Sequence, residues 1–324
     1  MNIRLNRTLP EGHLHSANQF DHNDALDKRK IGSLSVSVVG LGCNNFGRRV
    51  DQAGTQVVVD AALEAGINFF DTADIYGGTL SEEFLGKALG ARRKDIVLAT
   101  KFGMKVDENK KGGKPAYVKQ ACEDSLRRLG TDHIDLYQFH EPDPTVPLAD
   151  TLGAMMDLVK EGKVREIGCS NFSPEQLEEG EAISKKANGA RFVSVQNEYS
   201  LLHRDPEQGV LDACRKLDVA FIPYFPLFSG LLTGKYRKDK ALPTGTRIEA
   251  GSPRLEEQNL ENVEKYIAFA ESKGHTILEL AFGYLLAHKE VASVIAGATS
   301  AEQIRSNTGA IGWKMSESDF KEVG

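Results

Sequence analysis

The chain has 324 residues, 40% of them hydrophobic, and a formal net charge of −6 at pH 7. This length suits either two ordinary domains or one α/β barrel, and the composition is that of a globular protein. The acidic balance and the absence of long lysine or arginine runs argue against a nucleic-acid partner or an anionic membrane surface. Small molecules are therefore the expected ligands.

Four cysteines, Cys43, Cys122, Cys169 and Cys214, lie far apart in the sequence without a Cys-x-x-Cys pair. This spacing predicts reduced thiols rather than a disulfide framework or a zinc site. No apolar run approaches the roughly 18 residues of a membrane span. The opening residues also lack the apolar centre of a signal peptide. We therefore expect a cytoplasmic protein that does not enter a membrane.

Residues 1–27 are polar, mixed in charge and without a periodic pattern, which predicts a flexible arm outside the fold. His13, His15 and His22 in this arm could bind a metal ion, but a solvated arm is the preferred interpretation. No metal site is predicted. Residues 28–324 are expected to form a single domain.

From residue 28 the chain alternates short β-branched runs with amphipathic stretches, which often open on Ser, Thr, Asp or Pro and close on Gly. The amphipathic stretches are long enough for helical crossovers between parallel strands. Eight such units favour an α/β fold of the closed (β/α)₈ or TIM-barrel type over an open sheet. The eight strands are expected at residues 35–42, 67–70, 95–100, 134–139, 164–169, 192–196, 220–224 and 292–296.

Two segments interrupt this regular alternation. The piece KRKIGSLSVS, residues 28–37, predicts a β-hairpin over the barrel floor. Residues 228–262 form a long excursion after the seventh strand, and loops of that length in a compact domain are usually functional. We therefore expect long loops at the barrel mouth.

Polar residues follow three consecutive predicted strands. The stretch NFFDTADIYGG, residues 68–78, places Asp71 and Tyr76 after the second strand, while Lys101 and His140 follow the third and fourth. The carboxyl ends of barrel strands meet at one mouth, so these side chains should converge. A tyrosine is a poor proton donor unless a nearby cation lowers its pKa. We expect Lys101, oriented by Asp71, to be that cation, and His140 to hydrogen-bond a substrate oxygen.

Each of these residues also has a structural interpretation. Asp71 and Lys101 could form only an ion pair, Tyr76 could be a packing aromatic residue, and His140 could be a satisfied core histidine. Their joint placement at one mouth favours the functional interpretation. Asp74 is expected to be structural and to cap the turn.

Five segments resemble the aldo-keto reductase superfamily in order and spacing: DTADIYG, TKFG, SLRRLGTDHIDLYQFH, REIGCSNF and VQNEYS. The resemblance covers about residues 28–312. It implies a nicotinamide-dependent carbonyl reductase with Asp71, Tyr76, Lys101 and His140 as a catalytic tetrad. Hydride would pass from the nicotinamide to the carbonyl carbon while Tyr76 donates a proton to the oxygen.

The resemblance also implies a cofactor site. Ser170, Asn171 and Gln196 would hold the nicotinamide carboxamide, and Tyr224 would stack on the ring. The segment FPLFSGLLTGKY resembles the part of the family that wraps the cofactor diphosphate. The residues implied there are Ser229, Gly230, Leu231, Gly234 and Lys235.

At the adenosine end, the stretch AGATSAEQIRSN departs from the family pattern. Many members use a Lys and an Arg to grip the 2′-phosphate of NADP, and these positions are Gly297 and Gln303 here. Thr299, Ser300, Gln303 and Asn307 can still form hydrogen bonds. We expect NADPH because the family generally uses it, with NADH as the alternative.

The substrate is expected to be a small carbonyl compound bound by Asn45, Phe46 and Phe225. The chain ends soon after its last predicted helix, whereas family members with a long C-terminal tail use that tail to close the pocket. We therefore expect a more open site. The loop at residues 104–116 and the excursion at residues 232–262 are the expected specificity elements.

Two other functions share parts of this pattern, and the sequence predicts no oligomeric state. The potassium-channel β subunits resemble this chain at Gln303 and Asn307, but they carry asparagine at the position of His140, which favours the enzyme. An aldolase-type barrel could use Lys101 as a Schiff base. That alternative leaves the segments SNF and VQNEYS unexplained.

Overall fold

The computed structural model describes residues 26–323, so most of the predicted arm, with His13, His15 and His22, lies outside the described residues. Ten strands and ten α-helices are described in this range. The strands are β1 Lys28–Ile31, β2 Leu34–Ser37, β3 Val39–Gly42, β4 Phe69–Asp71, β5 Val97–Phe102, β6 Ile134–Phe139, β7 Val164–Ser170, β8 Phe192–Glu198, β9 Ala220–Tyr224 and β10 Val294–Gly297. The helices are α1 Gln52–Glu64, α2 Leu80–Leu89, α3 Pro115–Leu129, α4 Leu148–Lys160, α5 Pro174–Ala187, α6 Val210–Leu217, α7 Glu257–Ser272, α8 Ile277–Ala287, α9 Ala301–Gly309 and α10 Glu317–Val323.

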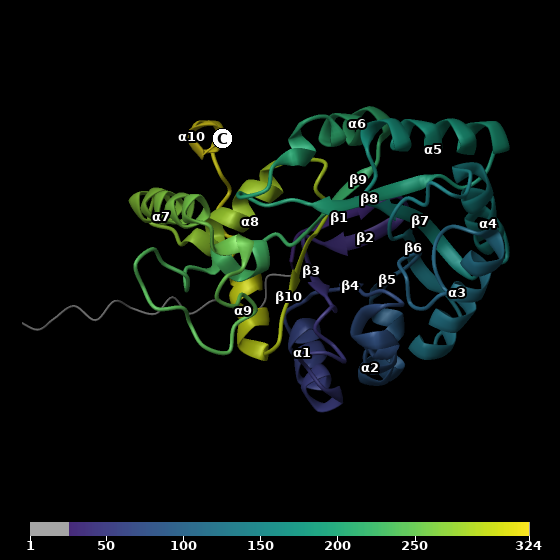
Figure 1. The fold of residues 1–324 in the computed structure, drawn as a ribbon, viewed down its shortest axis with the longest axis horizontal. Coiled ribbons are helices and arrows are strands. Elements are labelled where there is room, and N and C mark those ends of the chain that lie inside the picture. The colour runs from purple at the N-terminus through teal and green to yellow at the C-terminus, as the bar shows by residue number, and fades with distance from the viewer. Residues whose placement is uncertain (1–25, 324) are drawn as a thin grey trace, which may run out of the picture.

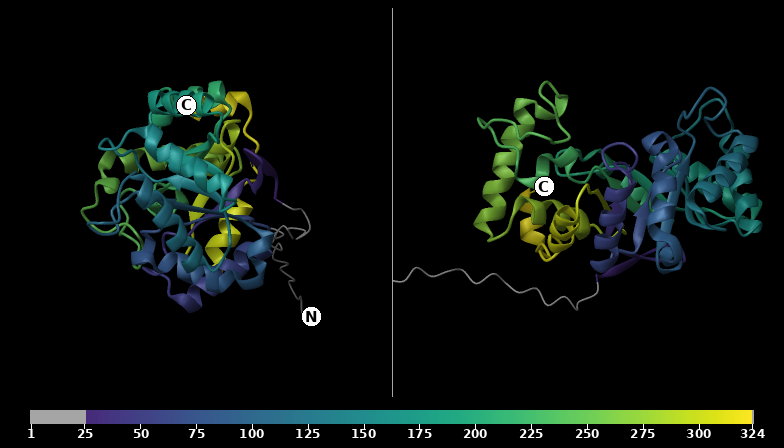
Figure 2. Two further views of the ribbon diagram at one scale, coloured as in Figure 1. Left: turned by 90° about the vertical axis from the view of Figure 1, so that its right-hand side faces the viewer. Right: turned by 90° about the horizontal axis from the view of Figure 1, so that it is seen from below.

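Eight parallel strands form one sheet in the order β10-β3-β4-β5-β6-β7-β8-β9. Its two edges approach each other near Phe221, whose amide donates to the Glu290 carbonyl at 2.7 Å and whose carbonyl accepts from the Ala292 amide at 2.9 Å. These bonds nearly close the sheet, which confirms the predicted (β/α)₈ barrel. In Figure 1, α1 and α2 lie below the strands, α3 and α4 to the right, and α5 and α6 above them. Figure 2 shows the same arrangement from two further directions.

The predicted strand positions hold, but the first strand was predicted too long. Residues 35–42 divide at Val38 into β2 and β3. Asn68 causes part of this break, because its Oδ1 accepts from the Ser37 amide at 2.6 Å and its Nδ2 donates to the Ser35 carbonyl at 2.9 Å. These bonds satisfy backbone groups of β2, while β3 turns into the barrel. The hydrophobic pattern of residues 35–42 continues across Val38 and does not indicate this break.

The N-terminal hairpin covers the barrel floor, as predicted. β1 and β2 pair antiparallel, and Ile31, Leu34 and Val36 are buried together with side chains inside the barrel. Arg29 locks the hairpin to the closing side of the barrel, because its guanidinium donates to the carbonyls of Leu286, His288 and Val291. The mouth therefore remains the open end.

The excursion after β9 is shorter than predicted, since α7 already begins at Glu257. It starts with a 3₁₀ segment, Phe228–Thr233, and three non-glycine residues nearby have left-handed backbones: Phe225 at φ 50°, Phe228 at φ 47° and Ser229 at φ 61°. Such conformations are strained for these residue types and concentrate at functional sites.

Two further predictions concern membranes and thiols. Within residues 26–323, no helix combines the length and apolar character needed to cross a membrane. All four cysteines are free and buried, so they pack as small apolar side chains.

Asp74 does more than cap a turn. It is buried, and its Oδ2 accepts from the Tyr117 hydroxyl of α3 at 3.1 Å. Glu82 is also buried nearby and pairs with Arg128 at 2.6 Å. Burial, and then the negative charge of Glu82, raise the pKa of Asp74 to about 7. Asp74 thus links the loop after β4 to α3 and gains a proton near neutral pH.

We expect this proton to make the unfolding free energy depend on pH. An unfolded aspartate has a pKa of about 3.9, so the folded state binds the proton more tightly and the contribution of Asp74 to stability falls as the pH rises toward about 7. Asp74→Asn removes this decrease in stability with rising pH, because asparagine does not titrate. Between about pH 5 and pH 8 the stability of the variant relative to the parent should rise by about 1–3 kcal/mol in urea unfolding. Asp95→Asn, at an exposed position, is the control. Parallel pH curves for Asp74→Asn and the parent would contradict the prediction.

Candidate active site

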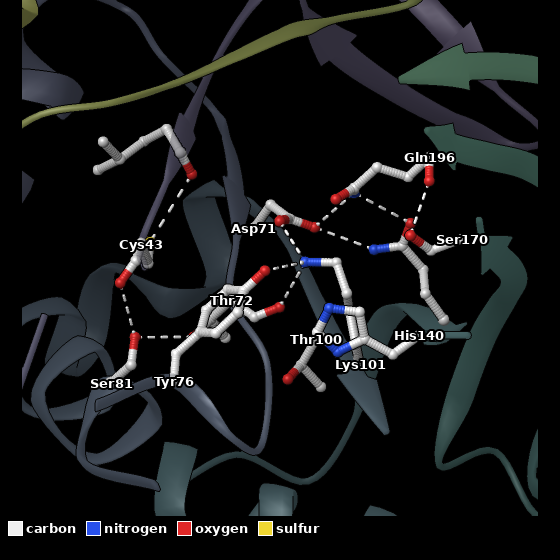
Figure 3. A network of polar contacts seen from close by, with 12 residues as sticks. Cys43, Asp71, Thr72, Tyr76, Ser81, Thr100, Lys101, His140, Ser170 and Gln196 are labelled. Carbon is white, nitrogen blue, oxygen red and sulfur yellow. Dashed lines mark hydrogen bonds and ion pairs between the residues drawn. The ribbon is translucent and has the colours of Figure 1, made fainter. Parts of the chain in front are cut away.

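Four predicted side chains converge at the carboxyl ends of neighbouring strands. Asp71 ends β4, Lys101 lies near the end of β5, His140 follows β6, and Tyr76 opens the short 3₁₀ turn before α2. Strand pairing fixes this arrangement, because Asp71 is opposite Ala99 and Lys101 is opposite Gln138. Figure 3 shows the side chains around the Lys101 ammonium group.

Lys101 is fully buried at the centre of this group. Its ammonium nitrogen donates to Asp71 Oδ2 at 2.5 Å, to the Thr72 carbonyl at 3.0 Å and to the Tyr76 hydroxyl at 3.4 Å. These contacts use all three donors of the ammonium group. Burial lowers the pKa of Lys101, but the charges and hydrogen bonds of Asp71 and Tyr76 raise it overall. Lys101 is therefore a charged amine in a site shielded from water.

Asp71 is held by two amides as well as by Lys101. Its Oδ1 accepts from Gln138 Nε2 and from Gln196 Nε2, both at 3.0 Å. The two glutamines also bond to each other at 3.3 Å. Four strands, β4, β5, β6 and β8, thus fix one carboxylate in position.

The sequence reasoning missed Gln138 and foresaw a different contact for Gln196. Gln138 is fully buried within the apolar strand β6, and a glutamine among residues such as Leu136 and Phe139 was the available signal. Gln196 was expected to hold a carboxamide, and in this structure its Nε2 already binds Asp71.

Tyr76 places its hydroxyl beside the ammonium group, as Figure 3 shows. Lys101 also lies 5.0 Å from the centre of the Tyr76 ring, and the His140 ring meets Tyr76 edge-on at 5.8 Å between centroids. Burial raises the pKa of Tyr76, and the charge and hydrogen bond of Lys101 only partly oppose this. Lys101 thus acts on the Tyr76 pKa in the expected direction, but desolvation is the larger effect and the net shift is upward.

His140 is a neutral imidazole. It is 7% exposed, and its Nδ1 is buried without a hydrogen-bond partner among residues 26–323. Burial, followed by the positive charge of Lys101, lowers the pKa of His140 well below its ordinary value. A neutral ring keeps one donor and one acceptor for hydrogen bonds.

The residues expected at the nicotinamide form a second polar group next to His140. Asn171 Nδ2 donates to the His140 carbonyl at 2.9 Å, and the Tyr224 hydroxyl donates to Asn171 Oδ1 at 2.9 Å. Ser170 Oγ donates to the Gln196 carbonyl at 2.7 Å. Asn171 has φ 61°, which asparagine tolerates better than most residues. Hydroxyl and amide groups at this position are chemically suited to an uncharged amide ligand.

The segment expected at the diphosphate is a 3₁₀ turn with left-handed residues. Gly230 has φ 102°, Gly234 has φ 81° and Ser229 has φ 61°. Leu231 is buried, whereas the Lys235 side chain is exposed. Consecutive backbone amides in such turns form concave anion sites. This geometry fits a phosphate group with Lys235 at its edge.

Three of the residues expected at the adenosine end, Thr299, Ser300 and Gln303, lie at the start of α9. Ser300 Oγ accepts from the Gln303 amide at 3.3 Å, and Gln303 Oε1 accepts from the Thr299 amide at 2.9 Å. These contacts cap the helix. Asn307 is buried within α9, and Gly297 is exposed at the end of β10.

The three expected substrate residues differ in accessibility. Phe225 is partly exposed at the mouth. Asn45 is buried, and its Nδ2 donates to the Ala298 carbonyl at 3.4 Å. Phe46 is fully buried in the main hydrophobic core, so it supports the mouth loop rather than presenting a free pocket wall.

The sequence reasoning also missed two arginines of the excursion. The Arg247 guanidinium lies 4.8 Å from the centre of the Phe225 ring, and that of Arg254 lies 3.9 Å from the centre of the Phe228 ring. Their only sequence signal was their position in a loop predicted to determine specificity.

Comparison with known proteins agrees with this geometry. The model of the Aldo/keto reductase family matches residues 38–324. Probable aldo-keto reductase 1 of Glycine max is 36% identical to this chain over 308 residues, which cover 91% of this chain and 87% of the relative. The range matched by the family model includes all eight strands of the barrel and its mouth. The chain therefore belongs to the aldo-keto reductase family of oxidoreductases.

Proposed function

We propose that this protein reduces aldehydes or ketones to alcohols with a nicotinamide cofactor, and that Tyr76 is the general acid. The observation that carries the proposal is the buried Lys101 ammonium, which contacts the Asp71 carboxylate and the Tyr76 hydroxyl together. A proton donor needs a group that stabilises the anion left after transfer. Lys101 has that role here.

The four residues of the tetrad have different roles in the proposed proton transfer. A bound reduced nicotinamide would supply the hydride for the carbonyl carbon. Tyr76 holds its proton at physiological pH, because an ordinary tyrosine has a pKa of about 10 and burial raises the pKa of Tyr76 further. When Tyr76 passes this proton to the carbonyl oxygen, the phenolate lies beside Lys101, whose position and charge are fixed by Asp71. Fixed charges of this kind need little reorganisation during the reaction.

His140 positions the substrate. Its ring lies edge-on to Tyr76, and the neutral imidazole can donate a hydrogen bond to the same carbonyl oxygen. Two donors that converge on one oxygen hold the carbonyl in a fixed orientation and polarise it.

Residues around the tetrad fit the cofactor. Ser170, Asn171 and Gln196 would bind the carboxamide, Tyr224 would stack on the ring, and the turn with Gly230 would receive the diphosphate. NADPH is the proposed form, as in the family generally, although Gly297 and Gln303 bring no charge to a 2′-phosphate. We also place the activity in the cytoplasm, because the four free cysteines suit a reducing compartment.

The first test is Tyr76→Phe, which removes the proton donor and keeps the ring. We expect kcat/KM for 4-nitrobenzaldehyde to fall about 100-fold or more, since general acids contribute rate factors of that size. The dissociation constant for NADPH, measured by fluorescence titration, should change little. Full activity of Tyr76→Phe would rule out Tyr76 as the acid.

Tyr266→Phe is the matched control, because the Tyr266 hydroxyl donates to the Leu201 carbonyl at 3.1 Å, away from the tetrad. A parent protein that binds NADPH or NADH but reduces no aldehyde or ketone of a broad panel would contradict the proposed enzyme. That result would instead favour a cofactor-binding regulatory protein.

A second test concerns the charge of His140. Because its pKa lies well below its ordinary value, the ring should remain neutral as the pH falls through about 6.5, where an exposed histidine gains a proton. Long-range ¹H–¹⁵N spectra of the imidazole report this directly, with His140→Asn used to assign the signal. A His140 titration midpoint near the ordinary value would contradict the neutral-donor role.

A further inference from the structure

The loop between β4 and Tyr76 is held at its first residue by β5 and α2. Residues 72–75 form this loop. The Thr72 amide donates to the Ala99 carbonyl at 2.9 Å, and the Thr72 hydroxyl lies 2.9 Å from the Ser81 hydroxyl at the start of α2, as Figure 3 shows. The loop therefore leaves β4 from a fixed position.

Asp74 ties the middle of the same loop to β5 and α3. Its amide donates to the Lys101 carbonyl at 3.0 Å, and its Oδ2 accepts from the Tyr117 hydroxyl at 3.1 Å. Asp74 thus bonds to the backbone of the residue whose ammonium group meets Tyr76. It is 2% exposed, and its Oδ1 has no hydrogen-bond partner among residues 26–323. The Tyr117 hydroxyl therefore fixes the carboxyl group from the side of α3.

The turn that carries Tyr76 is packed closely on its other side. Gly77 has a left-handed backbone at φ 61°. A methyl group at Gly77 would overlap the Phe46 carbonyl, so this turn lies directly against the loop after β3. Tyr76 therefore lies between two fixed points, the turn at Gly77 and the carboxyl group of Asp74. Loss of the Asp74 contact leaves the tyrosine held from one side only.

The contact between Tyr76 and Lys101 is sensitive to small displacements. The Tyr76 hydroxyl lies 3.4 Å from the Lys101 ammonium nitrogen, which is at the outer limit of hydrogen-bond distances. Movement of the ring away from Lys101 would weaken the stabilisation of the phenolate. A misplacement of about 1 Å at a reacting group can lower a rate about 100-fold. The residues that hold this loop therefore matter for the reaction.

Four ionisable groups face the Asp74 carboxyl group: Glu82 of α2, Tyr117 and Arg128 of α3, and Tyr137 of β6. Glu82 is fully buried and pairs with Arg128 at 2.6 Å, whereas Asp74 has no ion-pair partner among the described residues. Burial, and then the charge of Glu82, raise the pKa of Asp74 to about 7. Above this pH a second negative charge forms beside Glu82 inside the protein.

We propose that Asp74 is a positioning residue for Tyr76. Its carboxyl group and the Tyr117 hydroxyl together keep the proton donor within reach of Lys101. A charge on Asp74 disturbs this arrangement, because it is repelled by the buried charge of Glu82. The rate of carbonyl reduction therefore falls as Asp74 loses its proton. This inference rests on the proposed function of the site.

The first experiment measures the single-turnover oxidation of bound NADPH by 4-nitrobenzaldehyde, which separates the chemical step from product release. At about pH 6, Tyr117→Phe and Asp74→Ala should each lower this rate about 10-fold, because each frees the loop that carries the proton donor. The double variant should be slower than either single variant by no more than about twofold, since both changes remove one contact. The dissociation constant for NADPH should change little.

Tyr137→Phe is the matched control for this experiment. The Tyr137 hydroxyl is buried in the same region and donates to the Val118 carbonyl of α3 at 3.2 Å, so it bonds to the helix but not to the loop. Its removal should leave the single-turnover rate unchanged. Urea unfolding of every variant shows that it is folded, and Tyr117→Phe decides the test if Asp74→Ala does not fold.

A pH profile separates the hydrogen bond of Asp74 from its charge. Asn at this position still accepts from Tyr117 but does not titrate, so Asp74→Asn should keep at least about half of the parent rate at about pH 6 and hold it to about pH 8. The parent rate should fall about threefold or more over this range. Tyr76 and His140 do not cause such a fall, because burial raises the pKa of Tyr76 and lowers that of His140 well below its ordinary value.

The outcomes separate the two proposals. If the parent reduces no aldehyde, or if Tyr76→Phe keeps full activity, the proposed function itself is wrong. If the parent is active but Tyr117→Phe reacts as fast, or Tyr137→Phe is slowed equally, the positioning role is overturned. Parallel pH profiles for the parent and Asp74→Asn would also overturn it. The same holds if Tyr117→Phe weakens NADPH binding by the factor that it removes from the rate, because the contact would then serve the cofactor.

Discussion

The ion pair between Lys101 and Asp71 is the interaction on which the rest of the mouth depends. Both side chains are almost entirely buried, and removing two charges from water is costly unless every donor and acceptor is satisfied. Here Gln138 and Gln196 donate hydrogen bonds to the Asp71 carboxylate, and the Thr72 carbonyl accepts one from the Lys101 ammonium group. The pair therefore needs the ends of four strands in fixed register, which a parallel barrel provides.

This one cation influences the protonation of two neighbouring groups. Burial raises the pKa of Tyr76 and lowers that of His140, so both would be neutral in a dry site without charges. Lys101 opposes the first effect and strengthens the second. Tyr76 thus keeps its proton until transfer but has a cation ready to stabilise the phenolate, and His140 remains a neutral donor. Shielding from water and stabilisation of the product anion are obtained together.

The sequence predicts the barrel and the convergence of Asp71, Tyr76, Lys101 and His140 at its mouth, because both depend on local signals. Strand periodicity and the residue that follows each strand determine which side chains reach the mouth. The break at Val38 depends on a bond from Asn68, some 30 residues away, and therefore leaves no local pattern. The direction in which the Tyr76 pKa shifts depends on how deeply the side chain is buried, which a local sequence pattern does not give. The position of Phe46 after the first barrel strand suggests an aromatic residue that lines the pocket. The packing of the folded chain instead buries its ring in the hydrophobic core. Arg49 and Gly245 meet across 196 residues, beyond any spacing argument.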